Sequence, residues 1–420
     1  MTSPSVPSST VADDALALTD DLVRLRHRIH RHPEVGLHLP RTQQTVLEAL
    51  QGLDLEIRTG DSLSSVTAVL RGEGDTGRRG HRAAPGQRPV VLLRADMDAL
   101  PLTEELDVPY RSEVDGVMHA CGHDLHVTSL VGAAHLLAAQ RGNLPGDVVL
   151  MFQPGEEGWD GAGHMIREGV LEAAGRRADA AYALHVMSAL APRGAVASRP
   201  GPLLSASDGL FVTLRGRGGH GSAPHRAADP VPAIGEIVLG AQAVAGRTVG
   251  PFETGLVTFG KVEAGTRRNI IPSTAYAEAT IRTTDPEVRE RLHTALVRYC
   301  EGVAAAHGLE ADVVLEPEYP VTVNDARELD FAREVATGLF GADRWIDMPD
   351  PIAGAEDFSR VIDAVPGVMV FLGACLEGRD WETAPDNHSP LAGFDDSVLT
   401  DGAALLATLA ERRLVQLAGR

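Results

Sequence analysis

The chain has 420 residues, of which 44% are hydrophobic and 23% charged, and a formal net charge of -20 at pH 7. This length favours two domains, and the acidic balance disfavours nucleic acid and anionic membranes as partners. Cys121, Cys300 and Cys375 are odd in number and far apart, so they predict no disulfide framework and favour a cytoplasmic protein. Residues 1–14 lack a signal-peptide pattern and predict a flexible tail. No stretch approaches the roughly 18 to 20 apolar residues of a membrane span.

Hydrophobic periodicity predicts alternating helices and strands over the first 200 residues. Apolar residues recur at helical spacing in segments 15–29, 42–50, 125–140 and 161–172. Short apolar runs predict strands at 66–70, 90–93, 147–152 and 180–185. Residues 71–89, rich in Gly, Arg and Pro, predict a loop. Strands that alternate with helices are typical of an α/β fold with a central, mostly parallel sheet.

The order of elements changes over residues 201–320. A strand, a helix, two strands, a helix and a strand are expected at 210–214, 230–244, 255–262, 275–282, 286–307 and 310–315. This β-α-β-β-α-β order is typical of a ferredoxin-like α+β domain. The α/β pattern then resumes with elements at 326–339, 367–372 and 401–416. We therefore expect residues 15–200 and 321–420 to form one domain into which residues 201–320 are inserted.

A run of potential metal ligands stands just before the predicted helix at 125–140. The run His119-Ala-Cys-Gly-His-Asp-Leu-His126 contains three imidazoles, a thiol and a carboxylate. These groups are the common protein ligands of zinc-like ions. A buried cysteine beside histidines that cap the helix explains the run equally well when it is taken alone.

Other polar motifs stand where predicted strands end, which is where the active sites of α/β proteins collect. Arg94-Ala-Asp-Met-Asp98 follows one strand, Gln153-Pro-Gly-Glu-Glu-Gly158 follows another, and His185 ends a third. Asn387-His-Ser-Pro390 follows a loop near the C-terminus. Two adjacent glutamates on a tight turn point in different directions, so one can bind a metal while its neighbour transfers protons. Each motif alone has a capping or turn role as its alternative, but their recurrence favours one active site.

Together these motifs resemble the M20 metallopeptidase clan, and specifically its M20D branch of N-acyl-amino-acid amidohydrolases. That branch includes indoleacetyl-amino-acid hydrolases, hippurate hydrolases and N-acetyl-diaminopimelate deacetylases. The resemblance extends from about residue 20 to the C-terminus and rests on the motifs Arg94-Ala-Asp-Met-Asp-Ala-Leu-Pro101, His119–His126, Phe152-Gln-Pro-Gly-Glu-Glu-Gly158, Leu184-His-Val186, Gly218-Gly-His-Gly-Ser-Ala-Pro-His225, Asn269-Ile-Ile-Pro272, Gly354-Ala-Glu-Asp-Phe358 and Asn387-His-Ser-Pro390. It implies a dimetal hydrolase domain with an inserted lid or dimerisation domain.

The resemblance also implies roles for individual residues. Glu156 corresponds to the general base, and Asp98 to an orienting aspartate with which Asp96 could be confused. His220 resembles the histidine that polarises the substrate carbonyl, often from a partner subunit. The implied ligands of two divalent metal ions are Cys121, His123, Glu157, His185 and His388.

Four residues of the inserted segment are candidates for substrate binding. Asn269 resembles a substrate-binding residue of the lid, and Arg282 is a weaker candidate for binding a substrate carboxylate. Arg267 and Arg268 depart from the family's pattern. They are suited to a carboxylate, but a solvated turn is the simpler explanation.

The implied activity is hydrolysis of the amide bond of an N-acyl amino acid, of acetyl, benzoyl or indoleacetyl type, by a metal-activated water. One thiolate ligand favours zinc or nickel over magnesium, with manganese and cobalt also compatible. The implied partners are this small-molecule substrate and a second copy of the chain, bound through the inserted domain. Two alternatives stay open: an M20-type dipeptidase or aminopeptidase, and a metal-bearing binding protein that has lost catalysis. The presence of Glu156 argues against the second.

Overall fold

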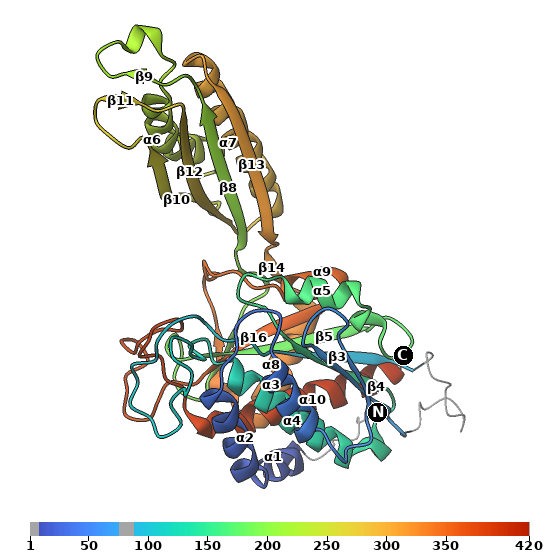
Figure 1. Cartoon of the computed structure of the whole chain (residues 1–420). Coiled ribbons are helices and arrows are strands. Elements are labelled where there is room, and N and C mark those ends of the chain that lie inside the picture. Colours follow the sequence, from blue (N-terminus) through green and yellow to red (C-terminus); the bar gives the residue numbers. More distant parts are fainter. Residues whose placement is uncertain (1–7, 75–87, 420) are drawn as a thin grey trace. The chain divides into compact units, whose positions relative to one another are not determined.

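The computed structural model describes residues 8–74 and 88–419, and the chain divides into two compact units (Figure 1). The first unit comprises Met1–Gly201, Val323–Pro349 and Arg360–Arg420. The second comprises Pro202–Thr322 and Asp350–Ser359. Most of the predicted loop at 71–89 lies outside the described residues.

The first unit is built on an eight-stranded mixed sheet. Its strands, in sheet order, are β1 (Glu56–Thr59), β2 (Val66–Leu70), β4 (Asp147–Gln153), β3 (Val90–Asp96), β5 (Ala180–Met187), β16 (Gly367–Gly373), β6 (Val196–Ser198) and β15 (Trp345–Asp347). The four central strands β4, β3, β5 and β16 run parallel. Their residues are almost all buried, because helices cover both faces of such a sheet. Parallel strands bring their carboxyl ends to one edge, and that edge carries the candidate site.

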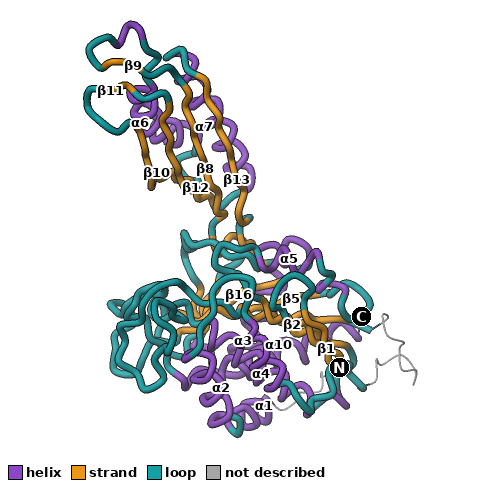
Figure 2. Tube along the Cα trace, in the orientation of Figure 1, coloured by secondary structure: helices purple, strands orange, loops and turns teal. Residues whose placement is uncertain are grey.

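Helices pack on the sheet of the first unit, most of them on one face (Figure 2). They are α1 (Ser8–Leu16), α2 (Thr19–Arg31), α3 (Pro40–Ala49), α4 (His123–Ala139), α5 (Gly161–Arg167), α8 (Ala326–Phe340), α9 (Ser359–Ala364) and α10 (Leu399–Ala418). α4 and α10 pack against each other and are the most completely buried of these helices. They approach closely at Gly132, where an added Cβ would lie 2.7 Å from the Cβ of Ala403.

The N-terminal segment differs from its prediction. Residues 1–14 were expected to form a flexible tail, but α1 begins at Ser8, and residues 1–7 lie outside the described part of the chain. Val11 and Ala15, four residues apart on one face of α1, are 3% and 0% exposed and belong to the main hydrophobic core. The burial of these two side chains accounts for the helix. The prediction missed it because the other residues of the segment are mostly polar.

The second unit is a four-stranded antiparallel sheet with two helices. Its elements are β8 (Ala206–Arg215), α6 (Pro230–Thr248), β10 (Gly255–Ala264), β12 (Thr274–Thr283), α7 (Pro286–Ala306) and β13 (Glu310–Tyr319). The strand order is β10-β12-β8-β13, which is the expected ferredoxin-like arrangement. Asp229 and Asp285 cap α6 and α7, and each precedes a proline in the first turn. The mixed α/β class with its central sheet and α+β insertion is therefore confirmed.

Short strands complete the fold. β9 (Gly219–His220) and β11 (Ile270–Ile271) pair beyond the ends of the main strands of the second unit. β7 (Gly201–Leu204) and β14 (Thr322–Asn324) lie where the chain passes between the units. Among the described helices, none has the length and apolar character needed to cross a membrane.

Candidate metal centre and active site

The predicted site residues of the first unit lie at the carboxyl ends of its central strands. Asp98 follows β3, Glu156 and Glu157 follow β4, and His185 belongs to the last part of β5. β3 pairs in parallel with both β4 and β5, so these three chain segments end side by side. The fold therefore gathers residues that are far apart in sequence at one edge of the sheet.

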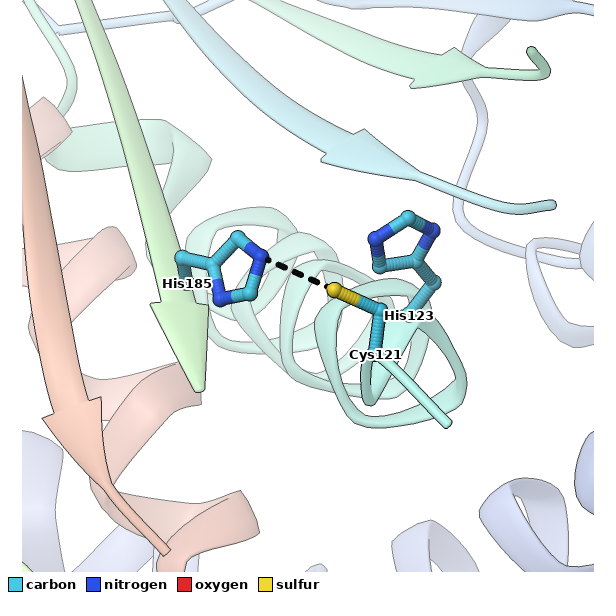
Figure 3. Close-up of side chains that lie close together, drawn as sticks. All are labelled: Cys121, His123 and His185. Atoms are coloured by element: carbon cyan, nitrogen blue, oxygen red, sulfur yellow. Dashed lines mark hydrogen bonds between the residues drawn. The ribbon is translucent and has the colours of Figure 1, made fainter. Parts of the chain in front are cut away.

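A tight turn brings Cys121 and His123 to the same place. Gly122, between them, has a φ of 83° and precedes α4 directly. An added Cβ at Gly122 would lie 2.4 Å from Cγ2 of Val186, so only glycine allows the turn to approach β5 this closely. The turn places the thiol and the imidazole beside His185 (Figure 3).

Five potential ligands form two groups that share one thiol. Sγ of Cys121 lies 3.4 Å from Nε2 of His185, and the ligand atoms of Cys121, His123 and His185 all lie within 4.8 Å of one another (Figure 3). The same limit holds for Cys121, Glu157 and His388. A tetrahedral zinc site with bonds of about 2.0 to 2.3 Å separates its ligand atoms by about 3.3 to 3.8 Å. Both groups are therefore compact enough to hold a metal ion.

Backbone carbonyls fix the direction of two imidazoles. Nδ1 of His123 donates to the carbonyl of Asp98 at 2.9 Å, and Nδ1 of His185 donates to the carbonyl of Val186 at 2.8 Å. In the neutral rings, the lone pair is therefore on Nε2, which is the arrangement typical of ligating histidines. Among the described residues, Nε2 of His123 is buried without a hydrogen-bond partner, and Oε1 of Glu157 is buried with only the imidazole of His388 beside it. A cation would satisfy both atoms, so the residues present fit a metal centre.

The charges of the site also fit a cation. Burial opposes ionisation of the Cys121 thiol, but the imidazoles of His185 and His123 outweigh it and hold its pKa well below its usual range. Burial and the negative charge of Cys121 raise the pKa of Glu157 to about 7. A thiolate and a carboxylate that repel each other are both stabilised by a divalent ion between them.

Asp98 fixes the backbone of the turn that carries the two adjacent glutamates. Its two carboxylate oxygens accept hydrogen bonds from the backbone N–H groups of Glu156, at 2.9 Å, and Glu157, at 3.1 Å. Oε1 of Glu157 lies 3.1 Å from Nε2 of His388, whereas Glu156 groups with His123 and Glu157 in a set within 4.8 Å. Glu156 is 6% exposed, so its carboxylate is enclosed beside the predicted ligands.

The neighbouring carboxylate Asp96 has different contacts from Asp98. It forms an ion pair with Arg94 and a hydrogen bond with Nδ1 of His126. Nε2 of His126 accepts from the backbone N–H of Val186 at 2.7 Å, so both ring nitrogens are occupied. Asp96 and His126 therefore brace the strand ends, and the geometry separates Asp96 from the orienting aspartate with which the sequence could confuse it.

His119, the first imidazole of the metal-ligand motif, lies apart from both ligand groups. Its ring is fully buried, and neither nitrogen has a hydrogen-bond partner among the described residues. Burial lowers the pKa of His119 to about 3, so the ring is neutral at pH 7.

The sequence analysis missed a buried network of charged and polar side chains between α2 and α4. Asp124, next to His123, accepts hydrogen bonds from Nε of Arg26 at 2.9 Å and from Nδ1 of His30 at 2.8 Å. Arg26 also donates to the carbonyl of Phe394 at 3.0 Å. The available signal was the spacing of Arg26 and His30, which places two polar side chains on the buried face of an amphipathic helix.

The predicted residues of the second unit fall into two places. His220 in β9 is paired with Ile270 in β11, and the N–H of Gly221 donates to the carbonyl of Asn269, so His220 and Asn269 are neighbours. Arg282 is near the other end of β12, opposite Ser207 at the start of β8. Thr274 begins β12 and follows β11, the strand that pairs with His220. At about 3.3 Å per residue, the eight residues from Thr274 to Arg282 span about 26 Å. The structure therefore does not bring Arg282 together with His220 within this unit.

Local hydrogen bonds fix the tautomer of His220. The backbone N–H of Ser222 donates to Nδ1 of His220 at 3.1 Å, and the Ser222 hydroxyl lies 2.8 Å from the same atom. The ring of a neutral His220 therefore carries its proton on Nε2. His220 is exposed, which leaves that N–H available to a ligand.

The chain was compared with known protein families and structures. The model of the peptidase family M20/M25/M40 matches residues 92–412. The chain belongs to this family. The prediction from the motifs is thus confirmed, and with it the assignment to hydrolases that act on amide bonds.

Curated relatives cover almost the whole chain. N-acetylcysteine deacetylase of Bacillus subtilis is 34% identical over 93% of this chain and 96% of its own. Thermostable carboxypeptidase 2 of Saccharolobus solfataricus is 34% identical over 95% and 96%. Hippurate hydrolase of Campylobacter jejuni is 33% identical over 96% and 98%. A solved structure of a dinuclear metal binding peptidase of the M20 family from Bacillus subtilis is 30% identical, with a TM-score of 0.79 over 95% of this chain and 98% of that one.

Proposed function

We propose that this protein is a metal-dependent amidohydrolase that cleaves the amide bond of N-acyl amino acids. The observation that carries the proposal is the pair of compact ligand groups that share Cys121, with the carboxylate of Glu156 enclosed beside them. Relatives named for N-acetylcysteine and hippurate, both N-acylated amino acids, support this substrate class.

The proposed ligands of two divalent metal ions are Cys121, His123, Glu157, His185 and His388. Metal ions held by these residues would lower the pKa of a bound water and polarise the substrate carbonyl. Glu156 accepts the proton of the attacking water and returns it to the leaving amine. Asp98 fixes the backbone N–H groups of Glu156 and Glu157 and so holds the turn that carries the proposed base and the proposed ligand.

His220 is proposed to stabilise the negative charge that develops on the carbonyl oxygen. Its Nε2–H is available because Ser222 occupies Nδ1. Ten-residue strands separate this histidine from the end of the second unit at which the chain enters and leaves it. We propose that the protein is a homodimer in which His220 and Asn269 act on the partner's site, and that Arg282 binds a substrate carboxylate.

The thiolate favours zinc or nickel as the metal, with manganese and cobalt compatible with the mixed ligand set. The three cysteines are free and buried, which supports a reducing, cytoplasmic location. Arg267 and Arg268 line a pocket of about 550 Å³ next to Ile270 and form a second, weaker candidate site for a carboxylate.

Hydrolysis of peptides from their C-terminus is a second candidate function. Two relatives are named thermostable carboxypeptidases, each 34% identical over 95% of this chain. Peptides and N-acyl amino acids share a C-terminal amino acid with a free carboxylate, and they differ in what lies on the other side of the amide bond.

A panel of substrates tests the proposal. Acetyl-, benzoyl- and indoleacetyl-amino acids, dipeptides and longer peptides are incubated with metal-free protein refilled with zinc, manganese, cobalt or nickel. We expect the highest kcat/KM on an N-acyl amino acid with at least one metal. Faster hydrolysis of peptides would favour the second candidate, and a protein that binds metal but hydrolyses none of the panel would contradict both.

A further inference from the structure

Asn387 makes an unusually complete set of hydrogen bonds in the loop that carries His388. Its Nδ2 donates to the carbonyls of Val186, at 3.0 Å, and Cys121, at 3.2 Å, and also lies 3.8 Å from Sγ of Cys121. Its Oδ1 accepts from the backbone N–H of Ser188, at 2.9 Å, and from the Ser188 hydroxyl, at 3.0 Å. Both ends of the amide are therefore fully used.

These bonds join the three chain segments that carry four of the five proposed ligands. The Val186 carbonyl that receives Nδ2 of Asn387 is the same one that fixes the tautomer of His185. The Cys121 carbonyl lies in the turn between Cys121 and His123. Asn387 itself precedes His388 in the chain, more than 200 residues from either partner.

The backbone of His388 needs this support. Its φ is 68°, a left-handed conformation that is uncommon and strained for a residue other than glycine. The N–H of His388 donates to the carbonyl of Ala120 at 2.9 Å, while the ring is largely exposed and lies against Glu157. Two contacts, one from this N–H and one from the Asn387 side chain, thus hold the strained loop against the turn at Cys121.

We infer that Asn387 is a positioning residue that sets the direction of the Cys121 thiolate and of His388 toward the metals. The inference rests on the proposed ligand set. An amide side chain is required because its two ends have opposite roles. Its NH₂ group donates to two carbonyl oxygens and faces the thiolate, and its carbonyl oxygen accepts from Ser188. An aspartate of the same shape would place negative charge beside two carbonyls and a thiolate, and an alanine would remove the donor that these three groups share.

Asn324 offers a matched control within the same unit. Its Nδ2 also donates to three partners, Ser198 Oγ and the carbonyls of Arg199 and Met369, and its Oδ1 accepts from the N–H of Met369. Its side chain therefore ties strands together by four bonds, against five for Asn387, but without contact to a proposed ligand.

The test is the affinity for cobalt, measured by competition with a chromophoric chelator, in wild type, Asn387→Ala, Asn387→Asp and Asn324→Ala. We expect both Asn387 variants to bind cobalt about 10- to 100-fold more weakly, the range typical of residues that orient metal ligands. We also expect a shifted thiolate-to-cobalt absorption band. Asn324→Ala should lower the melting temperature but keep the wild-type affinity and spectrum.

The inference is overturned if folded Asn387 variants keep wild-type affinity and spectrum, or if the wild type binds no cobalt. Should Asn387→Ala fail to fold, the milder Asn387→Ser takes its place, and unfolding of both variants would also overturn it. Hydrolysis of the substrate panel is scored separately. Weak binding by the variants with no hydrolysis by wild type rejects the proposed function alone, whereas normal binding by the variants with hydrolysis rejects the role of Asn387 alone.

Discussion

The two regions that are proposed to act on one substrate are built in opposite ways. At the sheet edge of the first unit, Cys121 and His123 are buried and braced by residues from distant segments. At the tip of the second unit, His220 is exposed on a two-residue strand, and its ring is held by its near neighbour Ser222. The first region is fixed by the core, and the second by the pairing of two short strands, β9 and β11.

This difference separates two kinds of contribution. Fixed ligands can hold ions in place without reorganisation, and their loss should cost metal as well as turnover. An exposed donor on a short pair of strands can approach a substrate that is already bound, and its loss should cost turnover alone. Variants in the two regions are therefore expected to leave different signatures.

A large effect on both metal content and activity is expected from breaking the fixed region at Cys121. Cys121→Ser removes the atom shared by both ligand groups, so metal content and kcat should fall together. If the variant loses about 4 kcal/mol of transition-state stabilisation, kcat should fall by about 10³-fold. Metal analysis and kinetics on the same preparation measure both. Cys375→Ser, at a cysteine that is also buried but outside the ligand groups, should change neither. Full metal content and activity in Cys121→Ser would show that the thiol is only a core residue.

A smaller effect is expected at the exposed tip. His220→Ala should lower kcat/KM by about 10²-fold, the scale of a lost oxyanion donor, with unchanged metal content and melting temperature. His225, exposed in the same motif, serves as the control, and His225→Ala should keep most of the activity. Wild-type kinetics in His220→Ala would remove this residue from the mechanism.

Mixed dimers sharpen the same comparison. If His220 acts on the partner's site, a His220→Ala chain and a Glu156→Gln chain together form one dimer with one intact site. Mixing the two inactive variants should then restore activity, up to about a quarter of the wild-type rate per chain if subunits exchange at random. No recovery, despite subunit exchange shown by mass spectrometry, would place His220 at its own chain's site.

The smallest effect on activity is expected inside the second unit, where Asp208 lies between Arg289 and His293. Burial raises the pKa of this carboxyl, but the hydrogen bonds from His293 and Arg289 outweigh it and lower the pKa below its usual value. The unfolded chain then binds more protons, so the stabilisation is present above about pH 4 and is lost as pH falls through the folded pKa.

Asp208→Asn should destabilise the second unit by about 1 to 3 kcal/mol at pH 7 and reduce its sensitivity to acid. Trp159, Trp345 and Trp381 all belong to the first unit, so tryptophan fluorescence reports on the unfolding of that unit alone. The stability of the second unit is therefore measured by hydrogen exchange. The exposed Asp312, on a strand of the same sheet, provides the control Asp312→Asn. An unchanged acid transition in Asp208→Asn would assign the pH dependence to other groups.

Much of the fold follows from periodicity in the sequence. The helices α4, α7 and α10 and the buried central strands lie within a few residues of their predicted positions, because their apolar patterns are long and continuous. The segment 15–29 was predicted as one helix, but the chain breaks between α1 and α2 near Leu18, without a proline or glycine to signal it. The short strands β1 and β15, at the two edges of the sheet, and β6, next to β15, were missed, because three or four residues carry too little pattern.

The sequence nominated the residues of the candidate site, but not the residues that hold them in place by hydrogen bonds. Strand ends and motif order were sufficient to nominate Cys121 and Glu157, since parallel strands must bring such residues to one edge. Asn387 and Arg26 act through hydrogen bonds to segments far away in sequence, and no local pattern encodes those partners. The adjacency of Asn387 to His388 was the only signal available.

The central claim is that two adjacent glutamates have separate roles, and one pair of variants tests it most directly. Glu156→Gln keeps the shape of the side chain but cannot accept a proton, whereas Glu157→Gln weakens a proposed ligand. With kcat and metal content measured under identical refilling conditions, Glu156→Gln should retain its metals and lose about 10⁴-fold or more in kcat, the upper end for a general base. Glu157→Gln should lose metal. Metal loss in Glu156→Gln with retention in Glu157→Gln would show that the roles are exchanged, and near-normal turnover in both variants would contradict the hydrolytic mechanism.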